Sequence, residues 1–465
     1  MRKPPRRARR LAVRAALATL ALIGVGAAIL AYRIALAGTG FAAKYVCSAV
    51  FVSNQSLEAA VEDLRAYRST PLDFVRVTLD REHQAATGSA LGFARRAAVH
   101  REGLGCALAI GTSPDALRRV ALQPRNAERP AAAWPDGDAD EAPPAGAALA
   151  RVLGEAFAER DGAPPRRTRA ILVVRSGRIV AERYAPGFSR ATRLPGWSMA
   201  KSVTATLAGV LVAEDKLALE RPVRLAEWGA GDPRAAITLA QMLQMSSGLE
   251  FDETYANPLS DVVYMLSGTG DVAGFAAAKP LAHPPGARFA YASGTTNLLM
   301  LAMREAVADD RAYLALPRRA LFDRIGMSSA LIEADASGTF VGSSLMFATA
   351  RDWARFGLLA LRDGVWNGHR ILPAGWVRFM TTPAPAAPER EYAGHWWLKL
   401  RANRGTAARA SLLPPDAFHA AGHGGQYVTV VPSRDTVIVR LGHAVDRDAW
   451  DQDAFAADVL SALGG

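Results

Sequence analysis

The sequence predicts an α+β fold in which both ends of a large C-terminal domain form one antiparallel sheet, flanked by helices and joined to an inserted helical subdomain. Near its start the domain reads RAILVVRSGRIVAERYA, two alternating runs around the tight turn Ser176-Gly177, which is the pattern of a β-hairpin. Near its end, QYVTVVPSRDTVIVRLGH repeats the pattern around residues 432–435. Because the segments between these hairpins have helical periodicity, the strands are expected to pair with one another instead of alternating with helices.

Five segments supply the predicted helices of this domain. Four lie between the hairpins and read SMAKSVTATLAGVLVAED, TLAQMLQMSSG, NLLMLAMREAVA and TARDWARFGLLALRDG. The fifth, DAWDQDAFAADVLSALG, follows the last strand and predicts a closing amphipathic helix. We therefore assign residues 166–465 to one domain.

Two smaller regions precede the domain. Residues 121–165 begin with a stretch that is dense in Pro, Ala and Asp and lacks an apolar period, which predicts a linker. Residues 37–120 predict a small N-terminal unit with two strand-like runs, YVCSAVFV and DFVRVTL, and a helix, SLEAAVEDLRAY, between them.

The N-terminus carries a membrane-targeting pattern. Eight basic residues and no acidic one occur in the first 33 positions, and they surround an uncharged run over residues 15–32. This predicts a cytosolic basic segment at 1–14 and a membrane anchor or signal segment at 15–36. The run is long for a cleaved signal peptide, which favours a retained anchor over cleavage after Ala37. Outside this segment the basic and acidic residues nearly balance, so we expect no nucleic-acid partner.

The two cysteines of the sequence, Cys47 and Cys106, both follow the anchor and so are expected in an oxidising compartment. We predict a disulfide between them. The alternative is two separate buried thiols that pack as small apolar side chains. Val46 precedes Cys47 where a lipoprotein site needs a small residue, which argues against lipidation.

The stretch PGWSMAKSV places Lys201 three residues after Ser198, in a chain with few lysines. Residues three apart on a helix share a face, so the amine can hydrogen-bond the serine oxygen. A lysine among small apolar residues can have its pKa lowered by desolvation and can then take the serine proton. The alternative is that Ser198 caps the helix and Lys201 extends to water.

Two further motifs accompany this pair: Tyr291-Ala-Ser293 before a predicted helix, and His423-Gly-Gly before a predicted strand. In this order the three motifs resemble those of the serine β-lactamase and penicillin-binding-protein superfamily, specifically its class C-type branch. The stretches LQMSSGLEFDETY, PGARFAYASGTTNLL and GHGGQ resemble its esterases and 6-aminohexanoate-dimer hydrolases most. The resemblance covers about residues 166–462.

The resemblance implies roles for the motif residues. Ser198 would be the acylated nucleophile, and Lys201 would position and deprotonate it. Tyr291 would act as general base in acylation and as acid to the leaving group. The backbone N–H groups of Ser198 and Gln426 would form the oxyanion hole.

The third motif and the neighbouring residues would bind substrate. Gly424 and Gly425 leave room for substrate along the strand edge. Ser293 would line the cleft, and Tyr255 would lie on a loop that closes it or would simply be a surface tyrosine. His423 occupies the position where lactamases and transpeptidases usually carry lysine. Because imidazole is mostly neutral at pH 7, this favours an esterase or amidase over a β-lactamase.

Together these features predict a membrane-anchored serine hydrolase of the bacterial inner membrane, with its catalytic domain on the periplasmic side, or secreted if the segment is cleaved. The substrate would be a small-molecule or peptide-like ester or amide. We expect no cofactor, and the sequence gives no oligomeric state.

Two other functions are alternatives to an esterase or amidase of this superfamily. A membrane-bound peptidoglycan or β-lactam sensor would keep the fold without turnover. An α/β-hydrolase would use Gly196-Trp-Ser198-Met-Ala200 as a nucleophile elbow, but no buried strand precedes that serine.

Two apparent motifs are interpreted as incidental. Glu253 in Glu253-Thr-Tyr-Ala-Asn resembles the deacylation glutamate of class A lactamases but precedes Tyr291, which is the wrong order. His419 and His423 have the spacing of a helical zinc pair, but the glycines and strand that follow argue against a helix. We therefore expect no metal.

Overall fold

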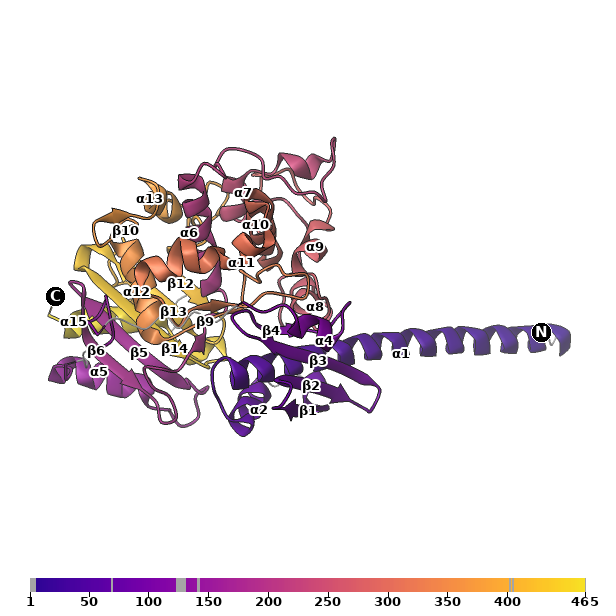
Figure 1. Cartoon of the computed structure of the whole chain (residues 1–465). Helices are drawn as coiled ribbons and strands as arrows, with labels where there is room; N and C mark the ends of the chain where they lie inside the picture. The colour runs from indigo at the N-terminus through magenta and orange to yellow at the C-terminus, as the bar shows by residue number, and fades with distance from the viewer. Residues whose placement is uncertain are drawn as a thin grey trace.

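A five-stranded antiparallel sheet, in the order β12-β13-β14-β5-β6, organises the larger part of the molecule (Figure 1). The computed structural model describes residues 6–67, 70–122, 131–139, 143–400, 403 and 405–464. The strands are β5 (Thr168–Arg175), β6 (Arg178–Tyr184), β12 (Phe418–Gly422), β13 (Gln426–Val431) and β14 (Thr436–Gly442). β14 pairs with β5, so the two ends of the domain meet in one sheet and the predicted α+β fold is confirmed.

The first predicted hairpin is β5–β6. Ser176 and Gly177 connect the strands with φ values of +49° and +72°, the left-handed conformation that a two-residue hairpin turn requires. Such a turn matches the right-handed twist of the strands, so Ser176-Gly177 between two alternating runs was enough to predict the hairpin.

Each face of the sheet is covered by helices. Ile171 and Val173 point to one face and pack with α5 (Ala147–Phe157) and α15 (Gln452–Ala462). Alternate residues of β5 point to the other face, where α12 (Ala350–Leu361) lies. The sheet is therefore buried on both sides, which explains why its strands are nearly continuously apolar.

The helical part of the domain lies beyond α12 (Figure 1). It contains α6 (Met199–Ala213), α7 (Leu239–Leu243), α8 (Asp261–Ser267), α9 (Val272–Ala277), α10 (Ser293–Val307), α11 (Asp310–Pro317) and α13 (Trp376–Thr381). The short helix α14 (Ala407–Ala410) packs against α15 instead. Short strands complete it: β7 (Leu194–Pro195), β8 (Leu331–Ile332), β9 (Met346–Ala348), β10 (Val365–Trp366) and β11 (His369–Arg370). Each of the five predicted helical segments contains a helix.

The N-terminal part is a four-stranded antiparallel meander with a long helix lying on it. The strands are β1 (Val75–Asp80), β2 (Ala85–Ala90), β3 (Ala94–Arg101) and β4 (Gly105–Leu108). The helices are α1 (Arg6–Phe51), α2 (Leu57–Arg65), α3 (Thr70–Asp73) and α4 (Pro114–Arg118).

One predicted strand of this unit is wrong. YVCSAVFV is the C-terminal end of α1, whose residues Val46, Cys47 and Val50 pack against the meander. A short apolar run fits a buried strand and a buried helix equally well, and here the contact with the sheet decides for the helix.

Cys47 in α1 and Cys106 in β4 form a disulfide, with 6.1 Å between their Cα atoms. The predicted pairing is therefore confirmed. The bond links the long helix to the last strand of the meander.

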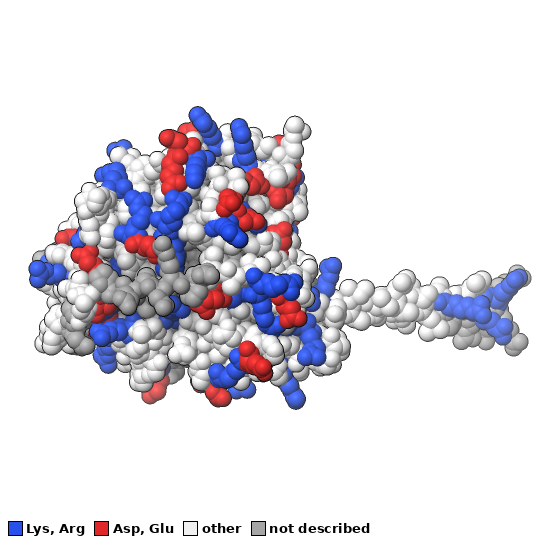
Figure 2. Space-filling view, viewed as in Figure 1, with Lys and Arg blue, Asp and Glu red and all other residues white. Residues whose placement is uncertain are grey.

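The first half of α1 extends away from the body of the molecule (Figure 1). Over residues 14–32 its side chains are exposed, and the helix is long and apolar enough to cross a membrane. Figure 2 shows basic side chains gathered near the far end of this helix and an uncharged stretch between them and the body. From residue 34 onward the helix packs into the protein.

The N-terminal unit is joined to the larger domain by buried polar contacts. The fully buried carboxylate of Glu333 accepts hydrogen bonds from the Ser48 hydroxyl at 2.9 Å and the Cys106 amide at 2.7 Å. The Lys44 ammonium forms an ion pair with the same carboxylate. Arg169 of β5 is likewise paired with Asp63 of α2. The predicted linker, residues 121–165, lies partly outside the described residues.

Removing one charge of the Lys44–Glu333 pair should destabilise the junction. Glu333→Gln keeps an acceptor for Ser48 and Cys106 but leaves the Lys44 ammonium without its anion, so we expect a loss of about 3 kcal/mol of unfolding free energy. The double variant Lys44→Met/Glu333→Gln should recover most of that loss. Urea unfolding of the full chain in detergent measures both, and equal stability of the two variants would contradict this ion-pair assignment.

Candidate active site

Ser198 lies at the entrance of α6, at the end of a tightly held loop. The Gly196 amide donates to the Met346 carbonyl at 2.8 Å, which pins the loop to β9. A Cβ at Gly196 would lie 2.3 Å from the Trp353 ring, so only glycine fits there. Trp197 has φ +47°, a strained conformation for an aromatic residue of the kind that clusters at functional sites.

Lys201 lies one turn further along α6 and is buried. Its Nζ is 3.0 Å from the Ser198 hydroxyl, 3.0 Å from the Ser293 hydroxyl and 3.0 Å from the Ser343 carbonyl. Ser198 makes no side-chain capping bond to the helix. The alternative of a capped helix with a solvated lysine is therefore not what the structure shows.

Burial lowers the pKa of Lys201 to about 8, although the Glu253 carboxylate acts in the opposite direction. The amine is thus neutral in a substantial fraction of molecules near neutral pH and can accept a proton.

Tyr291 approaches the same serine from the segment before α10. Its phenol is close enough to Ser198 for that side chain to act on its pKa, and the Lys201 Nζ lies 4.7 Å from the centre of its ring. Burial and the Glu253 charge raise the pKa of Tyr291 above its usual value, and the effect of Ser198 only partly offsets this. Of the two candidate bases, Lys201 therefore loses its proton first. Sequence reasoning had left that question open.

Glu253, whose likeness to the deacylation glutamate of class A lactamases is interpreted above as incidental, lies at the candidate site. Its carboxylate accepts the Ser293 amide at 2.8 Å and the Ser293 hydroxyl at 2.6 Å. It therefore binds the first turn of α10 and acts electrostatically on Lys201 and Tyr291. The position of Glu253 before Tyr291 in the sequence gives no information about this contact, because residues 253 and 293 come together only in the folded chain.

Tyr255 faces the site. Its phenol donates to the Glu253 carboxylate at 3.5 Å, and its ring stacks with that of His423 at a centroid distance of 5.7 Å. It remains 39% exposed, so it lies at the rim of the site. Of the two positions left open by the sequence, the structure places this tyrosine at the cleft.

His423, Gly424 and Gly425 form the turn between β12 and β13. The two glycines have φ values of +72° and +79°, which other residues rarely adopt. Burial lowers the pKa of His423 to about 4, with a smaller contribution from Arg447, so this imidazole is neutral at pH 7. His419 lies in β12 and bonds Thr429 at 3.0 Å, so the two histidines do not form a helical pair.

The backbone N–H of Gln426, expected from the sequence to form part of the oxyanion hole, instead faces Gly422 within the β12–β13 hairpin. β12 is the edge strand, and His419 exchanges both backbone hydrogen bonds with Trp397 on its outer side. Because backbone groups alternate along a strand, the Ala421 amide also points outward, whereas the pair Gly422 and Gln426 faces inward across the hairpin. The outer edge of β12 lies next to the serine loop, since a Cβ at Gly422 would be 2.1 Å from the Gly196 carbonyl.

An antiparallel α+β domain with a serine and a lysine at the start of the buried helix α6, and a tyrosine just before α10, defines a protein of the β-lactamase and penicillin-binding-protein fold class. The β-lactamase family model matches residues 154–461, and the chain belongs to this family. The α/β-hydrolase alternative is therefore wrong.

Individual relatives are distant. A 6-aminohexanoate-dimer hydrolase of Paenarthrobacter ureafaciens is 27% identical over 321 residues, which cover 64% of this chain and 79% of that protein. A putative β-lactamase from Bacteroides dorei has a TM-score of 0.53 at 19% identity, covering 67% of this chain and 96% of that one. A family VIII carboxylesterase has a TM-score of 0.50 at 16% identity, covering 70% and 98%. These structural similarities show the shared fold.

Glu253→Gln should move the pH dependence of the site. The glutamate raises the pKa of Lys201 from the level set by burial, so its neutralisation lowers that pKa further. The wild-type rate of active-site acylation should rise through about pH 8, and the variant should rise about one pH unit lower. Stopped-flow acylation by a fluorophosphonate measures this, with exposed Glu250→Gln as the matched control. Coincident profiles for the variant and wild type would contradict the role assigned to Glu253.

Proposed function

We propose that this protein is a serine hydrolase that cleaves an ester or amide through an acyl-enzyme. The observation that carries the proposal is the position of the Ser198 hydroxyl between the Lys201 amine and the Tyr291 phenol. A hydroxyl becomes a useful nucleophile when a neighbouring base can take its proton and another group can protonate the leaving atom. The two neighbours of Ser198 support the proposal because each is of a suitable chemical type.

In the acylation step, neutral Lys201 takes the proton of Ser198 while Oγ forms a bond to the substrate carbonyl carbon. The tetrahedral intermediate collapses as the bond to the leaving oxygen or nitrogen breaks. Tyr291 donates its proton to that atom and recovers one from the Lys201 ammonium. A water molecule then attacks the acyl-enzyme with the same groups in reverse roles, which releases the acid and restores Ser198.

The oxyanion hole is proposed to combine two backbone donors. The first is the Ser198 amide, which precedes the bonded amides of α6: those of Met199, Ala200 and Lys201 donate to Gly196, Trp197 and Ser198. The second is the outward-facing amide of Ala421 on the edge of β12, in place of Gln426. Gly424 and Gly425 keep the adjoining turn free of side chains.

The third motif supports an ester or amide substrate without a carboxylate at this position. A neutral His423 supplies no permanent cation there. Such a cation is what a β-lactam or peptide carboxylate would need. The relatives include both a hydrolase of aminohexanoate dimers and a carboxylesterase, which is consistent with either bond type.

The N-terminal helix is proposed to be a retained membrane anchor. Its exposed apolar stretch, the basic residues that precede it and the Cys47–Cys106 disulfide support an extracytoplasmic location for the hydrolase domain. In a bacterium this is the periplasmic face of the inner membrane.

Ser198→Ala should lower the hydrolysis of p-nitrophenyl acetate by at least about 10⁴-fold, because the bond-forming oxygen is lost. Lys201→Ala should lose about 10²–10⁴-fold. Exposed Ser411→Ala is the matched control and should retain wild-type activity. Stopped assays of the full chain in detergent measure turnover, and mass spectrometry follows the acyl adduct. Activity retained in Ser198→Ala would reject the proposal, and an adduct formed without turnover would favour the sensor alternative.

A further inference from the structure

The N-terminal unit reaches the candidate active site through Tyr67, which lies outside the family-matched range 154–461. The Tyr67 ring stacks with that of His423 at a centroid distance of 5.7 Å and an angle of 14°. His423 also stacks with Tyr255 at 5.7 Å and 14°, and it meets Trp197 edge-on at 5.7 Å. Trp197 directly precedes Ser198. A residue of the N-terminal unit is thus in contact with the third motif.

The Tyr67 ring is held in place from its other side. It meets the rings of Phe41, Tyr45 and His443 edge-on, at centroid distances of 5.3, 5.9 and 5.4 Å. Edge-on packing of this kind fixes the orientation of an aromatic ring. Tyr67 is therefore part of a rigid wall between α1 and the site.

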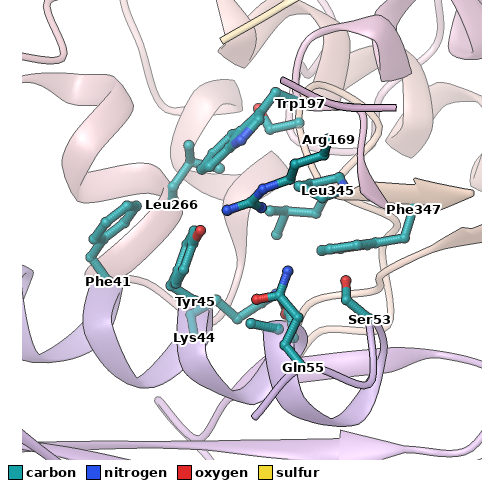
Figure 3. A pocket seen from close by; sticks show the side chains of 14 residues that line it. Phe41, Lys44, Tyr45, Ser53, Gln55, Arg169, Trp197, Leu266, Leu345 and Phe347 are labelled. Carbon is teal, nitrogen blue, oxygen red and sulfur yellow. Dashed lines mark hydrogen bonds between the residues drawn. The ribbon is translucent and has the colours of Figure 1, made fainter. Parts of the chain in front are cut away.

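A pocket of about 50 Å³ lies on the α1 side of this wall, where α1 meets the serine loop, and Phe41, Tyr45, Trp197, Leu345 and Phe347 surround it (Figure 3). The Tyr67 hydroxyl is buried and has no hydrogen-bond partner among the described residues.

We propose that Tyr67 is a specificity-determining residue whose ring closes the His423 side of the cleft and restricts the substrate to slender, unbranched ester or amide chains. Branched acyl groups and fused bicyclic β-lactams would collide with this ring. The proposal rests on the hydrolase function proposed above and adds a substrate class to it.

The test compares Tyr67→Ala with wild type on p-nitrophenyl butyrate, the branched p-nitrophenyl pivalate and a chromogenic cephalosporin. We expect the ratio of kcat/KM for the bulky substrates to that for butyrate to rise about tenfold or more, because the variant opens space beside His423. Tyr67→Phe should keep the wild-type ratio. Exposed Tyr264→Ala is the matched control.

A second substitution acts in the opposite direction. Tyr67→Trp fills more of the cleft and should lower kcat/KM for butyrate relative to acetate while the protein stays folded. Unchanged ratios in Tyr67→Trp, or in a folded Tyr67→Ala, would overturn the proposal. Absence of turnover by the wild type on every ester would instead overturn the hydrolase function itself.

A separate observation concerns the turn between β2 and β3. Leu91 and Phe93 at this turn are 71% and 59% exposed, so neither side chain contributes to the core. Leu91 also has φ +52°, a strained conformation for this residue type. The Phe93 ring lies 6.1 Å from that of Tyr32, the last residue of the exposed apolar stretch of α1. The turn is therefore level with the point where the helix leaves the body (Figure 1).

We infer that this turn inserts into the lipid interface of the bilayer that α1 crosses, so that the body rests on the membrane at two points. The inference commits to lipid because the turn is continuous with the apolar stretch of α1, through Tyr32 and Phe93. Exposed aromatic and aliphatic side chains beside a spanning helix are favoured at that depth. It rests on α1 being a retained anchor.

Single cysteines test this, because both native cysteines are in the disulfide. Leu91→Cys, Leu20→Cys and Leu412→Cys in the full chain are labelled with a nitroxide and reconstituted in phosphatidylethanolamine–phosphatidylglycerol vesicles. Leu412 is 73% exposed on the hydrolase domain and serves as the matched aqueous control. Collision with oxygen and with a water-soluble nickel complex should place Leu91 at the interface and Leu20 within the bilayer.

Two outcomes would contradict the inference in different ways. If the label at Leu91 is as accessible to nickel as the label at Leu412 while the label at Leu20 is protected, the turn does not insert into the lipid interface. If Leu20 is also accessible to nickel, α1 is not an anchor, and both statements fall together.

Discussion

The contact between the Lys201 amine and the Ser198 hydroxyl is the constraint on which the site depends. An amine buried this deeply needs acceptors, and it finds three within 3.0 Å, on α6, on α10 and at Ser343. Satisfying it therefore fixes the relative positions of those segments. The same burial lowers its pKa toward neutrality, as the proposed role of Lys201 as base requires.

Glu253 partly offsets the effect of burial on the pKa of Lys201. Its carboxylate holds the first turn of α10 through Ser293, and its charge partly restores the pKa of Lys201 while raising that of Tyr291. The two effects separate the proton affinities of amine and phenol, so one group can serve as base while the other keeps its proton. Groups tuned apart in this way are typical of acid–base sites.

The N-terminal unit and the hydrolase domain share buried contacts at two levels. Glu333 joins them through Ser48, Lys44 and the Cys106 amide, in the interior. Tyr67 joins them at the rim of the site, through His423. The contacts of Glu333 fix the N-terminal unit on the hydrolase domain. They therefore also fix the position of the Tyr67 ring beside His423. The C-terminal half of α1 thereby becomes part of the structure that surrounds the site.

Local patterns in the sequence were enough to predict the two hairpins, the helices and the Ser198, Lys201 and Tyr291 motifs, because turn chemistry, periodicity and short spacing act over a few residues. The disulfide was predicted because both cysteines follow the membrane-targeting segment. Tertiary structure decided the rest. YVCSAVFV is helical because it packs against the meander, and the Gln426 amide faces inward because Gln426 pairs with Gly422 across the β12–β13 hairpin. Glu253 and Tyr67 contact the site from distant parts of the sequence. Such contacts depend on how elements pack, which no local pattern encodes.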